Sequence, residues 1–190
     1  MDRCVFRLFS LLIAFLPLKA WAVAYSLPAD TFGACTGAWS AASNTCGSRV
    51  VFQPGDTLTV TQALTLRADA GFELKGDNSL GEGAPVALVS TYGAITAGTG
   101  SRVNGSLTSA SGIIELTGTR VSGPVEGKGV GSMTESLIAG DVRFQNGLTA
   151  VGSDFFGAIT VTNGSISLAG GRVEGLVSSD CCTVTTNGTV

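Results

Sequence analysis

The sequence contains no histidine, and only 13% of its 190 residues are charged. Without histidine, the chain cannot build a Ser-His-Asp or Cys-His catalytic arrangement from its own residues. Zinc sites are commonly made by histidine or by two cysteine pairs of regular spacing, and the chain has neither, so we predict no metal and no other cofactor. The net charge of −3 argues against nucleic acid as a partner.

Long apolar runs are missing except near the start of the chain. Two arginines, Arg3 and Arg7, precede an apolar run from Leu8 to Leu18, and small residues follow at Ala20-Trp21-Ala22. This order is typical of an export signal peptide. The run is much shorter than a membrane span, which needs about 20 residues. We therefore predict a signal peptide over residues 1–22 that is cleaved on export.

Cleavage would place the mature chain in the periplasm, on the outer cell surface or in the medium, with no transmembrane span. A second small-x-small triplet, Ala22-Val23-Ala24, leaves the mature N-terminus open between Val23 and Tyr25.

Four cysteines remain after the leader, which itself holds Cys4. In an oxidising compartment, an even number of cysteines favours disulfides, and the short loop between Cys35 and Cys46 makes that pair the preferred bridge. Cys181 and Cys182 are adjacent, and a bond between them would be strained because consecutive Cα atoms lie only about 3.8 Å apart. They could instead stay reduced or pair with other cysteines.

Glycine is abundant, and it marks a repeat. Between Arg102 and Ser178 an apolar-x-Gly-x-apolar pattern occurs five times at a nearly constant spacing. The central glycines are Gly105, Gly123, Gly140, Gly157 and Gly175. A fixed period of this length predicts stacked coils of a β-solenoid.

The handedness of the coils follows from the period. An aliphatic residue does not recur at every sixth position, which argues against a left-handed hexapeptide solenoid. The expected fold is an all-β, right-handed parallel β-helix with about 17–18 residues per coil.

Two inward columns follow from this register. The first contains Val103, Val121, Ile138, Phe155 and Val173; the second contains Leu107, Val125, Val142, Ile159 and Val177. A second strand of each coil is centred on Ile95, Ile114 with Leu116, Thr149 with Val151, and Ile166 with Leu168. The repeat glycines suit tight corners, so Gly123→Val is expected to destabilise more than Gly131→Val, which we place in a loop.

The chain divides into a signal peptide (1–22), an N-terminal cap segment (23–48) and the β-helix (49–190). Solenoids expose an apolar cross-section at each end, and Phe32 with Trp39 would cover the first coil. A strand pattern runs up to Val190, so we expect the β-helix to be incomplete there, with an open end that continues or pairs with another chain.

The outer faces offer little for catalysis. Glu126 and Arg143 are expected to be neighbours in a surface ion pair, and Arg102 above Arg120 forms a positive spot that could contact an acidic sugar or simply face solvent. The carboxylates Glu115, Glu126, Glu135, Asp141, Asp154 and Glu174 share no column, so we predict that the protein is not an enzyme. Two Thr-x-Thr segments, Thr160–Thr162 and Thr183–Thr185, resemble an ice-binding face locally, but the intervening coils do not keep the column.

Several segments together resemble a family. These are the leader, Tyr25-Ser26-Leu27-Pro28, the Cys35/Cys46 pair, the strand Gly55 to Val60 and the segment Ser179 to Thr189. They are similar to the N-terminal region of large exported bacterial proteins of the MshQ type, which are associated with biogenesis of the mannose-sensitive haemagglutinin (MSHA) pilus, a type IV pilus. The coils also look like bactofilins, although bactofilins generally lack an export signal.

The resemblance implies a structural or adhesion module of the bacterial cell envelope, with pilus or envelope components or surface glycans as partners. Two alternatives stay open. One is a polysaccharide-binding or polysaccharide-cleaving β-helix; the other is a bactofilin-like polymer that associates end to end.

Overall fold

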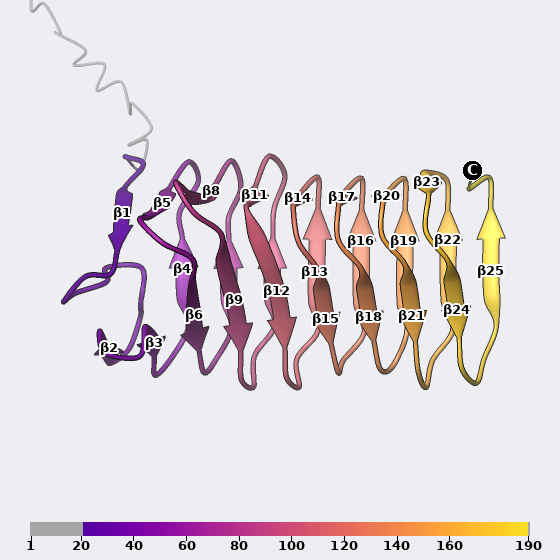
Figure 1. Ribbon diagram of the computed structural model, residues 1–190, viewed down its shortest axis with the longest axis horizontal. Helices are drawn as coiled ribbons and strands as arrows, with labels where there is room; N and C mark the ends of the chain where they lie inside the picture. The colour runs from indigo at the N-terminus through magenta and orange to yellow at the C-terminus, as the bar shows by residue number, and fades with distance from the viewer. Residues whose placement is uncertain (1–20, 190) are drawn as a thin grey trace, which may run out of the picture.

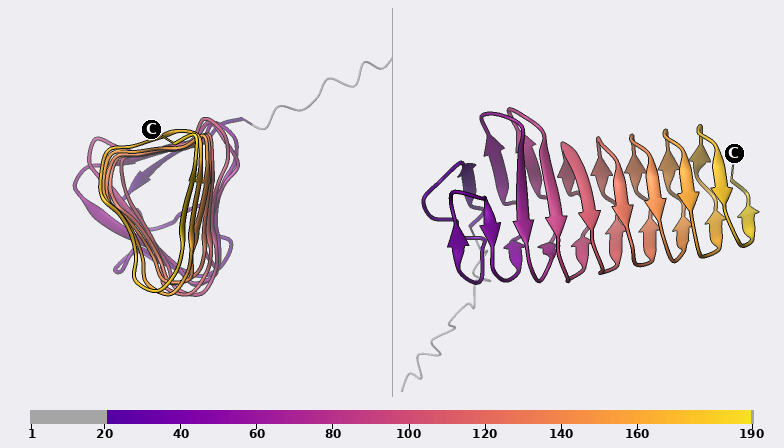
Figure 2. Two further views of the ribbon diagram at one scale, coloured as in Figure 1. Left: turned by 90° about the vertical axis from the view of Figure 1, so that its right-hand side faces the viewer. Right: turned by 60° about the horizontal axis from the view of Figure 1, so that its bottom comes forward.

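The computed structural model describes residues 21–189, and every regular element in this part of the chain is a β-strand. Residues 1–20 of the expected leader, and Val190, lie outside the described residues. The strands stack as coils along one axis, from β1 to β25, and the coils wind in the right-handed sense (Figure 1). Viewed along this axis, each coil is a triangle (Figure 2, left). The predicted right-handed parallel β-helix is confirmed.

Each of the eight coils contributes strands to three sheets, here called A, B and C. Along each coil, the chain passes first through sheet A, then through sheet C and then through sheet B. Sheet A contains β1 (Ala24–Leu27), β5 (Thr57–Val60), β8 (Ser79–Glu82), β11 (Arg102–Val103), β14 (Arg120–Val121), β17 (Leu137–Ile138), β20 (Asp154–Phe155) and β23 (Arg172–Val173). Sheet C contains β2 (Trp39–Ser40), β3 (Thr45–Cys46), β6 (Leu64–Ala68), β9 (Val86–Ser90), β12 (Gly105–Ser109), β15 (Val125–Gly127), β18 (Val142–Phe144), β21 (Ile159–Val161) and β24 (Val177–Ser179). Sheet B contains β4 (Val50–Phe52), β7 (Phe72–Leu74), β10 (Ile95–Ala97), β13 (Ile114–Thr117), β16 (Gly131–Thr134), β19 (Leu148–Val151), β22 (Ile166–Ala169) and β25 (Val184–Asn187). All the strand pairs are parallel except β2 with β3.

The predicted period holds from Arg102 onward, where the sheet A strands begin at regular intervals at Arg102, Arg120, Leu137, Asp154 and Arg172. Earlier coils are longer, because the paired residues Thr57, Ser79 and Arg102 lie farther apart in the sequence than Arg102 and Arg120 do. Part of the difference lies in the strands, since β5 and β8 are longer than β11. The short period therefore describes only the C-terminal coils.

Both predicted inward columns are confirmed by the strand register. Val103, Val121, Ile138, Phe155 and Val173 are successive partners in sheet A. Leu107, Val125, Val142, Ile159 and Val177 are successive partners in sheet C. All are buried except Val173 and Val177 of the last coil, which are half-buried. Burying each such side chain contributes about 1.5–3 kcal/mol, and only stacking buries it.

The predicted placement of Thr149 and Val151 in the core is wrong by one residue. Leu148 and Ala150 of β19 point inward, whereas Thr149 is exposed on the outer face. Successive side chains of a strand alternate between faces, so a shift of one residue exchanges the two sets.

Gly131 is also not a loop residue. It lies buried in β16, between Ile114 and Leu148 in the inward column of sheet B. The ring of Phe144 occupies the space that a side chain would need: a Cβ at Gly131 would lie 2.5 Å from one ring carbon, and a Cβ at Gly127 would lie 2.6 Å from another. The expected contrast between Gly123→Val and Gly131→Val therefore fails, because both positions lack room.

The repeat glycines stand at the corner between sheets A and C, each above the backbone of the preceding coil. A Cβ at Gly123 would lie 2.6 Å from the carbonyl oxygen of Gly105, and one at Gly157 would lie 2.5 Å from the carbonyl carbon of Gly140. Among the five, only Gly105 has a positive φ, of 146°. Close approach of the coils, rather than backbone conformation, therefore requires most of these glycines. A second column, at the corner between sheets C and B, contains Gly93, Gly112, Gly129 and Gly164 and is interrupted by Asn146.

The third corner, between sheets B and A, is built from buried polar side chains. Its column contains Asp56, Asn78, Ser101, Thr119, Ser136 and Ser153, all at most 2% exposed. Hydroxyls satisfy the backbone of the neighbouring coil: Thr119 N–H donates to Ser136 Oγ (3.2 Å), and Ser136 N–H donates to Ser153 Oγ (3.1 Å). This corner thus replaces close glycine contacts by a chain of hydrogen bonds.

The N-terminal segment supplies both strands and a cover. β1 and β3 pair with β5 and β6, so residues 23–48 form part of the first coil. Between these strands, Phe32 is buried against Phe52 of β4, with ring centroids 6.0 Å apart, and against Trp39 at 5.0 Å. Cys35 and Cys46 form a disulfide with a Cα–Cα distance of 5.6 Å. The aromatic side chains therefore pack on the end of the apolar interior.

Candidate functional site

The carboxylates that a polysaccharide-cleaving site would need are spread over all three outer faces. Glu115 lies on β13 in sheet B, Glu126 on β15 in sheet C and Asp154 on β20 in sheet A. Within residues 21–189, no three His, Cys, Asp or Glu side chains gather in a way that could hold a metal ion. The acidic residues thus form no common cluster on the described surface.

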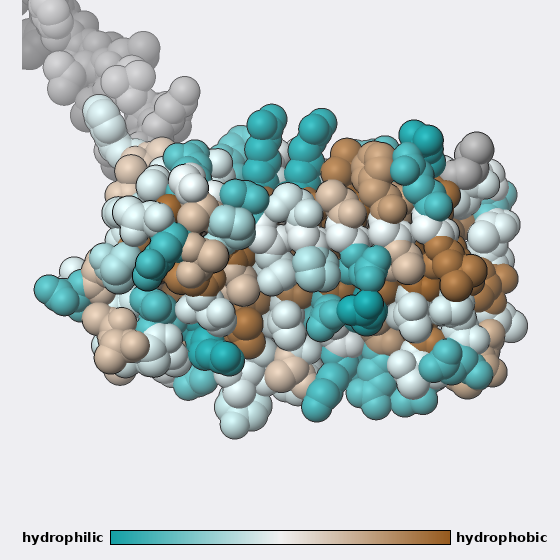
Figure 3. Space-filling model, in the orientation of Figure 1, coloured by the Kyte–Doolittle hydropathy of each residue, from teal (hydrophilic) through white to brown (hydrophobic). Residues whose placement is uncertain are grey.

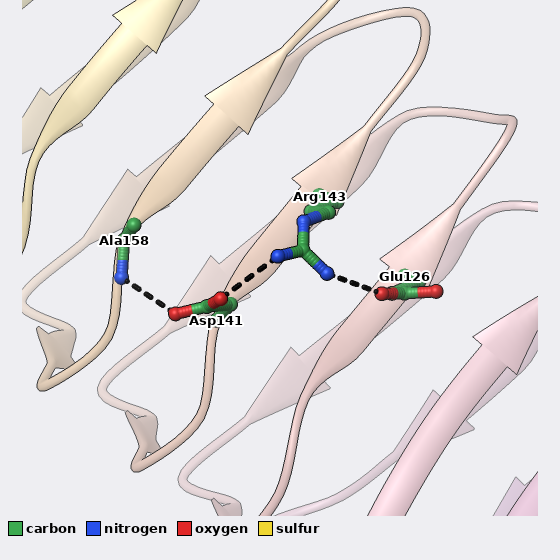
Figure 4. Close-up of polar contacts among 4 residues, drawn as sticks. All are labelled: Glu126, Asp141, Arg143 and Ala158. Carbon is green, nitrogen blue, oxygen red and sulfur yellow. Dashed lines mark hydrogen bonds and ion pairs between the residues drawn. The ribbon is translucent and has the colours of Figure 1, made fainter.

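Two carboxylates do converge, on Arg143 of sheet C (Figure 4). Its guanidinium donates to Glu126 Oε1 and to Asp141 Oδ2, both at 2.9 Å. The other oxygen of Asp141 accepts the backbone N–H of Ala158 at 3.0 Å. The predicted Glu126–Arg143 pair is confirmed. Asp141 was missed, although its position two residues before Arg143 places it on the same face.

This network links three successive coils, because Glu126 belongs to β15, Arg143 to β18, and Ala158 directly precedes β21. The Arg143 side chain is 58% exposed and the two carboxylates 42% and 43%. Solvent-exposed pairs of this kind contribute about 0–1 kcal/mol each. A groove of about 440 Å³ runs beside the network, lined also by Lys128, Phe144 and Gln145. Figure 3 shows that hydrophilic, intermediate and hydrophobic residues are mixed over this face of the molecule.

Arg102 and Arg120 form the second polar feature, on the outer face of sheet A. They are register partners on β11 and β14, and both are exposed. Neither forms an ion pair with another residue in the described part of the chain. Together they border a shallow groove of about 260 Å³ whose other walls include Leu137 and Ala139. Two neighbouring arginines beside apolar side chains can bind a planar anion such as a sugar carboxylate.

The two Thr-x-Thr segments do not lie on one face. Thr160 belongs to β21 in sheet C, whereas Thr185 belongs to β25 in sheet B. On sheet B, the outward column reads Thr96, Glu115, Ser132, Thr149, Ser167 and Thr185, so a carboxylate interrupts the hydroxyls.

Cys181 and Cys182 form a disulfide with each other, with a Cα–Cα distance of 3.7 Å. They lie in the corner that precedes β25, where earlier coils place glycine. Both cysteines are exposed, and Ser179 Oγ accepts the Cys182 N–H while donating to the carbonyl of Gly164. Of the alternatives that the sequence leaves open, the structure adopts the vicinal bond.

The chain matches no protein-family model, no curated protein and no solved structure. Among the residues described by the structure, none forms a helix long and apolar enough to cross a membrane. The repeat glycines and the Cys35–Cys46 pair occupy corners and the N-terminal segment, whereas Arg102, Arg120 and the Arg143 network lie on outer faces. These outer residues are the candidates for contact with a partner.

Proposed function

We propose that this chain is an exported structural module of the bacterial cell envelope, acting as a rigid stalk or adhesion element. The observation that supports this most is the unbroken apolar interior, which continues through eight coils. With about 4.8 Å between paired strands, eight coils make a rod of roughly 38 Å. Each coil is held by its neighbours on both sides, so the rod resists bending without a separate scaffold.

Two further observations support export. The leader has the residue order of a signal peptide, and the Cys35–Cys46 disulfide is of a kind that persists in oxidising compartments. Cell fractionation tests this proposal directly. We expect leader-free protein outside the cytoplasm, whereas full-length protein confined to the cytoplasm would contradict export.

We further propose a link to a type IV pilus of the MSHA kind, which rests on the resemblance to MshQ-type proteins. An in-frame deletion of the codons for residues 50–189 is expected to reduce pilus-dependent adhesion while the leader and cap segment are still produced. Unchanged pilus number and adhesion in the deletion strain would refute this link.

Binding of an acidic polysaccharide is the second candidate function, supported by Arg102 and Arg120, which pair with no carboxylate in the part of the chain that the structure describes. The double variant Arg102→Ala/Arg120→Ala is expected to lose binding to a polyuronate but not to gain binding to a neutral glucan. Arg67→Ala is the matched control, because Arg67 is an exposed arginine on sheet C whose register partners, Thr45 and Val89, are uncharged. Equal polyuronate binding by all variants would exclude this surface. Release of reducing ends from the polysaccharide would contradict the non-enzymatic proposal.

A further inference from the structure

A buried carboxylate stands at the N-terminal end of the polar column. Asp56 is fully buried, and it is held by the turn that it closes: its N–H donates to Gln53 O (3.0 Å), and its Oδ2 accepts the Gln53 N–H (2.7 Å). Pro54 and the positive φ of Gly55 (83°) are typical of the central positions of a type II turn. The turn therefore fixes where the carboxylate points.

The second oxygen of Asp56 points at the backbone nitrogen of Val23. The Val23 N–H donates to Oδ1 at 2.7 Å, and the Val23 carbonyl accepts the Thr57 N–H at 3.0 Å. Val23 thus occupies a defined position directly before β1.

No cationic group of residues 21–189 pairs with Asp56. The ion pairs within this range involve Arg49, Arg143 and Arg172, and the carboxylate contacts only neutral backbone N–H groups. A buried charge without an opposite charge is unfavourable, because removal from water is only partly offset by hydrogen bonds. Burial raises the pKa of Tyr25 on β1, and the nearby carboxylate of Asp56 raises it further.

The missing positive charge can come from the chain itself. Trp21 is 92% exposed and Ala22 is exposed, so the chain leaves the first coil at this point. Ala22 is also the last residue of the first small-x-small triplet. If the bond between Ala22 and Val23 is cut, the nitrogen that now donates to Asp56 becomes an α-ammonium group at the same place.

We propose that the leader is removed after Ala22, and that the new Val23 ammonium forms an ion pair with the buried carboxylate of Asp56 that locks β1 onto β5. This inference rests on the export part of the proposed function. Hydrolysis of the peptide bond leaves a carboxylate on Ala22 and an amine on Val23, which is protonated near neutral pH. Cleavage after Ala24 would remove Val23, take the hydrogen-bond donor from Oδ1 and shorten the β1–β5 pairing at Ala24.

Sequencing the N-terminus of the exported protein tests the cleavage site. We expect Val23 as the first residue, and a mature chain starting at Tyr25 would overturn the proposal. Leader-bearing protein in the cytoplasm would refute export instead.

The ion pair is tested separately on purified chains that begin at Val23, with and without an N-terminal acetyl group. Acetylation keeps the N–H donor and removes the charge, so we expect the Tm to fall by about 4 °C or more. In the Asp56→Asn background acetylation is expected to change the Tm little, whereas in Asp30→Asn, which alters an exposed aspartate of the same segment, the effect persists. Should Asp56→Asn not fold, the natural chain alone decides: equal Tm values for its free and acetylated forms would overturn the ion pair.

Discussion

Replacing Gly123 by alanine tests whether close contact between coils explains the glycine column. The added methyl carbon would lie 2.6 Å from the Gly105 carbonyl oxygen and 2.9 Å from the carbonyl carbon, whereas ordinary contact begins at 3.4 Å. The same oxygen accepts the Gly123 N–H at 2.8 Å. The two coils must therefore separate by several tenths of an ångström at this corner, or the backbone must rotate and weaken that hydrogen bond.

The expected loss of stability follows from three contributions. A weakened backbone hydrogen bond costs about 0.5–1.5 kcal/mol. Forcing a methyl group into filled space costs about 1–3 kcal/mol. Alanine also restricts the unfolded chain, which returns about 0.4–1 kcal/mol. The free energy of unfolding is therefore expected to fall by roughly 0.5–4 kcal/mol, equivalent to a Tm decrease of about 1–16 °C in a chain of this size.

Gly47→Ala is the matched control, because a Cβ at Gly47 would meet its nearest atom at 3.6 Å and no positive φ applies there. Urea unfolding followed by circular dichroism measures both variants, and hydrogen exchange locates the weakened amides. We expect lost protection in β12 and β15 for Gly123→Ala alone. Midpoints of Gly123→Ala and Gly47→Ala that both equal that of the unchanged chain would refute the close-contact explanation.

Three other perturbations probe the core, the surface and the titratable groups. Phe144→Ala is expected to lower the free energy of unfolding by about 3–5 kcal/mol. Gly131→Ala is expected to lower it less in the Phe144→Leu background than in the unchanged chain, which a double-mutant cycle measured by urea unfolding would show. Arg143→Ala is expected to lower the free energy of unfolding by no more than about 1 kcal/mol, with a smaller effect in concentrated salt, and a loss above about 3 kcal/mol would mean that the network is not a surface one. Burial, with a further contribution from Asp56, raises the pKa of Tyr25 in the folded chain. The phenol therefore ionises at lower pH in the unfolded chain than in the folded chain, and the free energy of unfolding falls as the pH rises from the unfolded-state pKa toward the folded-state pKa. Thermal melts between about pH 8 and 11 should therefore show a shallower fall in Tm for Tyr25→Phe than for the unchanged chain.

The glycine period could be recognised in the sequence because close contact tolerates no side chain at this corner of the C-terminal coils. Gly123, Gly140 and Gly157 therefore recur without substitution, and the apolar residues around them take the correct register. The outer pair of Glu126 and Arg143 followed from the same register.

Other parts of the interior could not be predicted from the sequence, because there the coils keep the total side-chain volume constant but not the residue type at each position. In the inward column of sheet B, Ile114 and Leu148 flank Gly131, and the missing volume is supplied by Phe144 from sheet C. A search for repeated apolar residues passes over such a glycine and assigns it to a loop. The prediction that Thr149 faces the core was wrong for the same reason. No repeated residue type shows which face of β19 points inward, and the residues that do so are Leu148 and Ala150.

The three corners show why the chain can form a rod from so few charged residues. At two corners the coils approach so closely that a Cβ on the corner glycines would overlap the backbone of the preceding coil, and at the third the hydroxyls of Thr119, Ser136 and Ser153 bond to the backbone of the preceding coil. Every corner thus fixes the distance to its neighbour, so the register does not depend on surface ion pairs. The outward-facing side chains are therefore not needed to hold the register between coils. Arg102 and Arg120, which form no ion pair within residues 21–189, can therefore stay exposed without any loss of register between the coils.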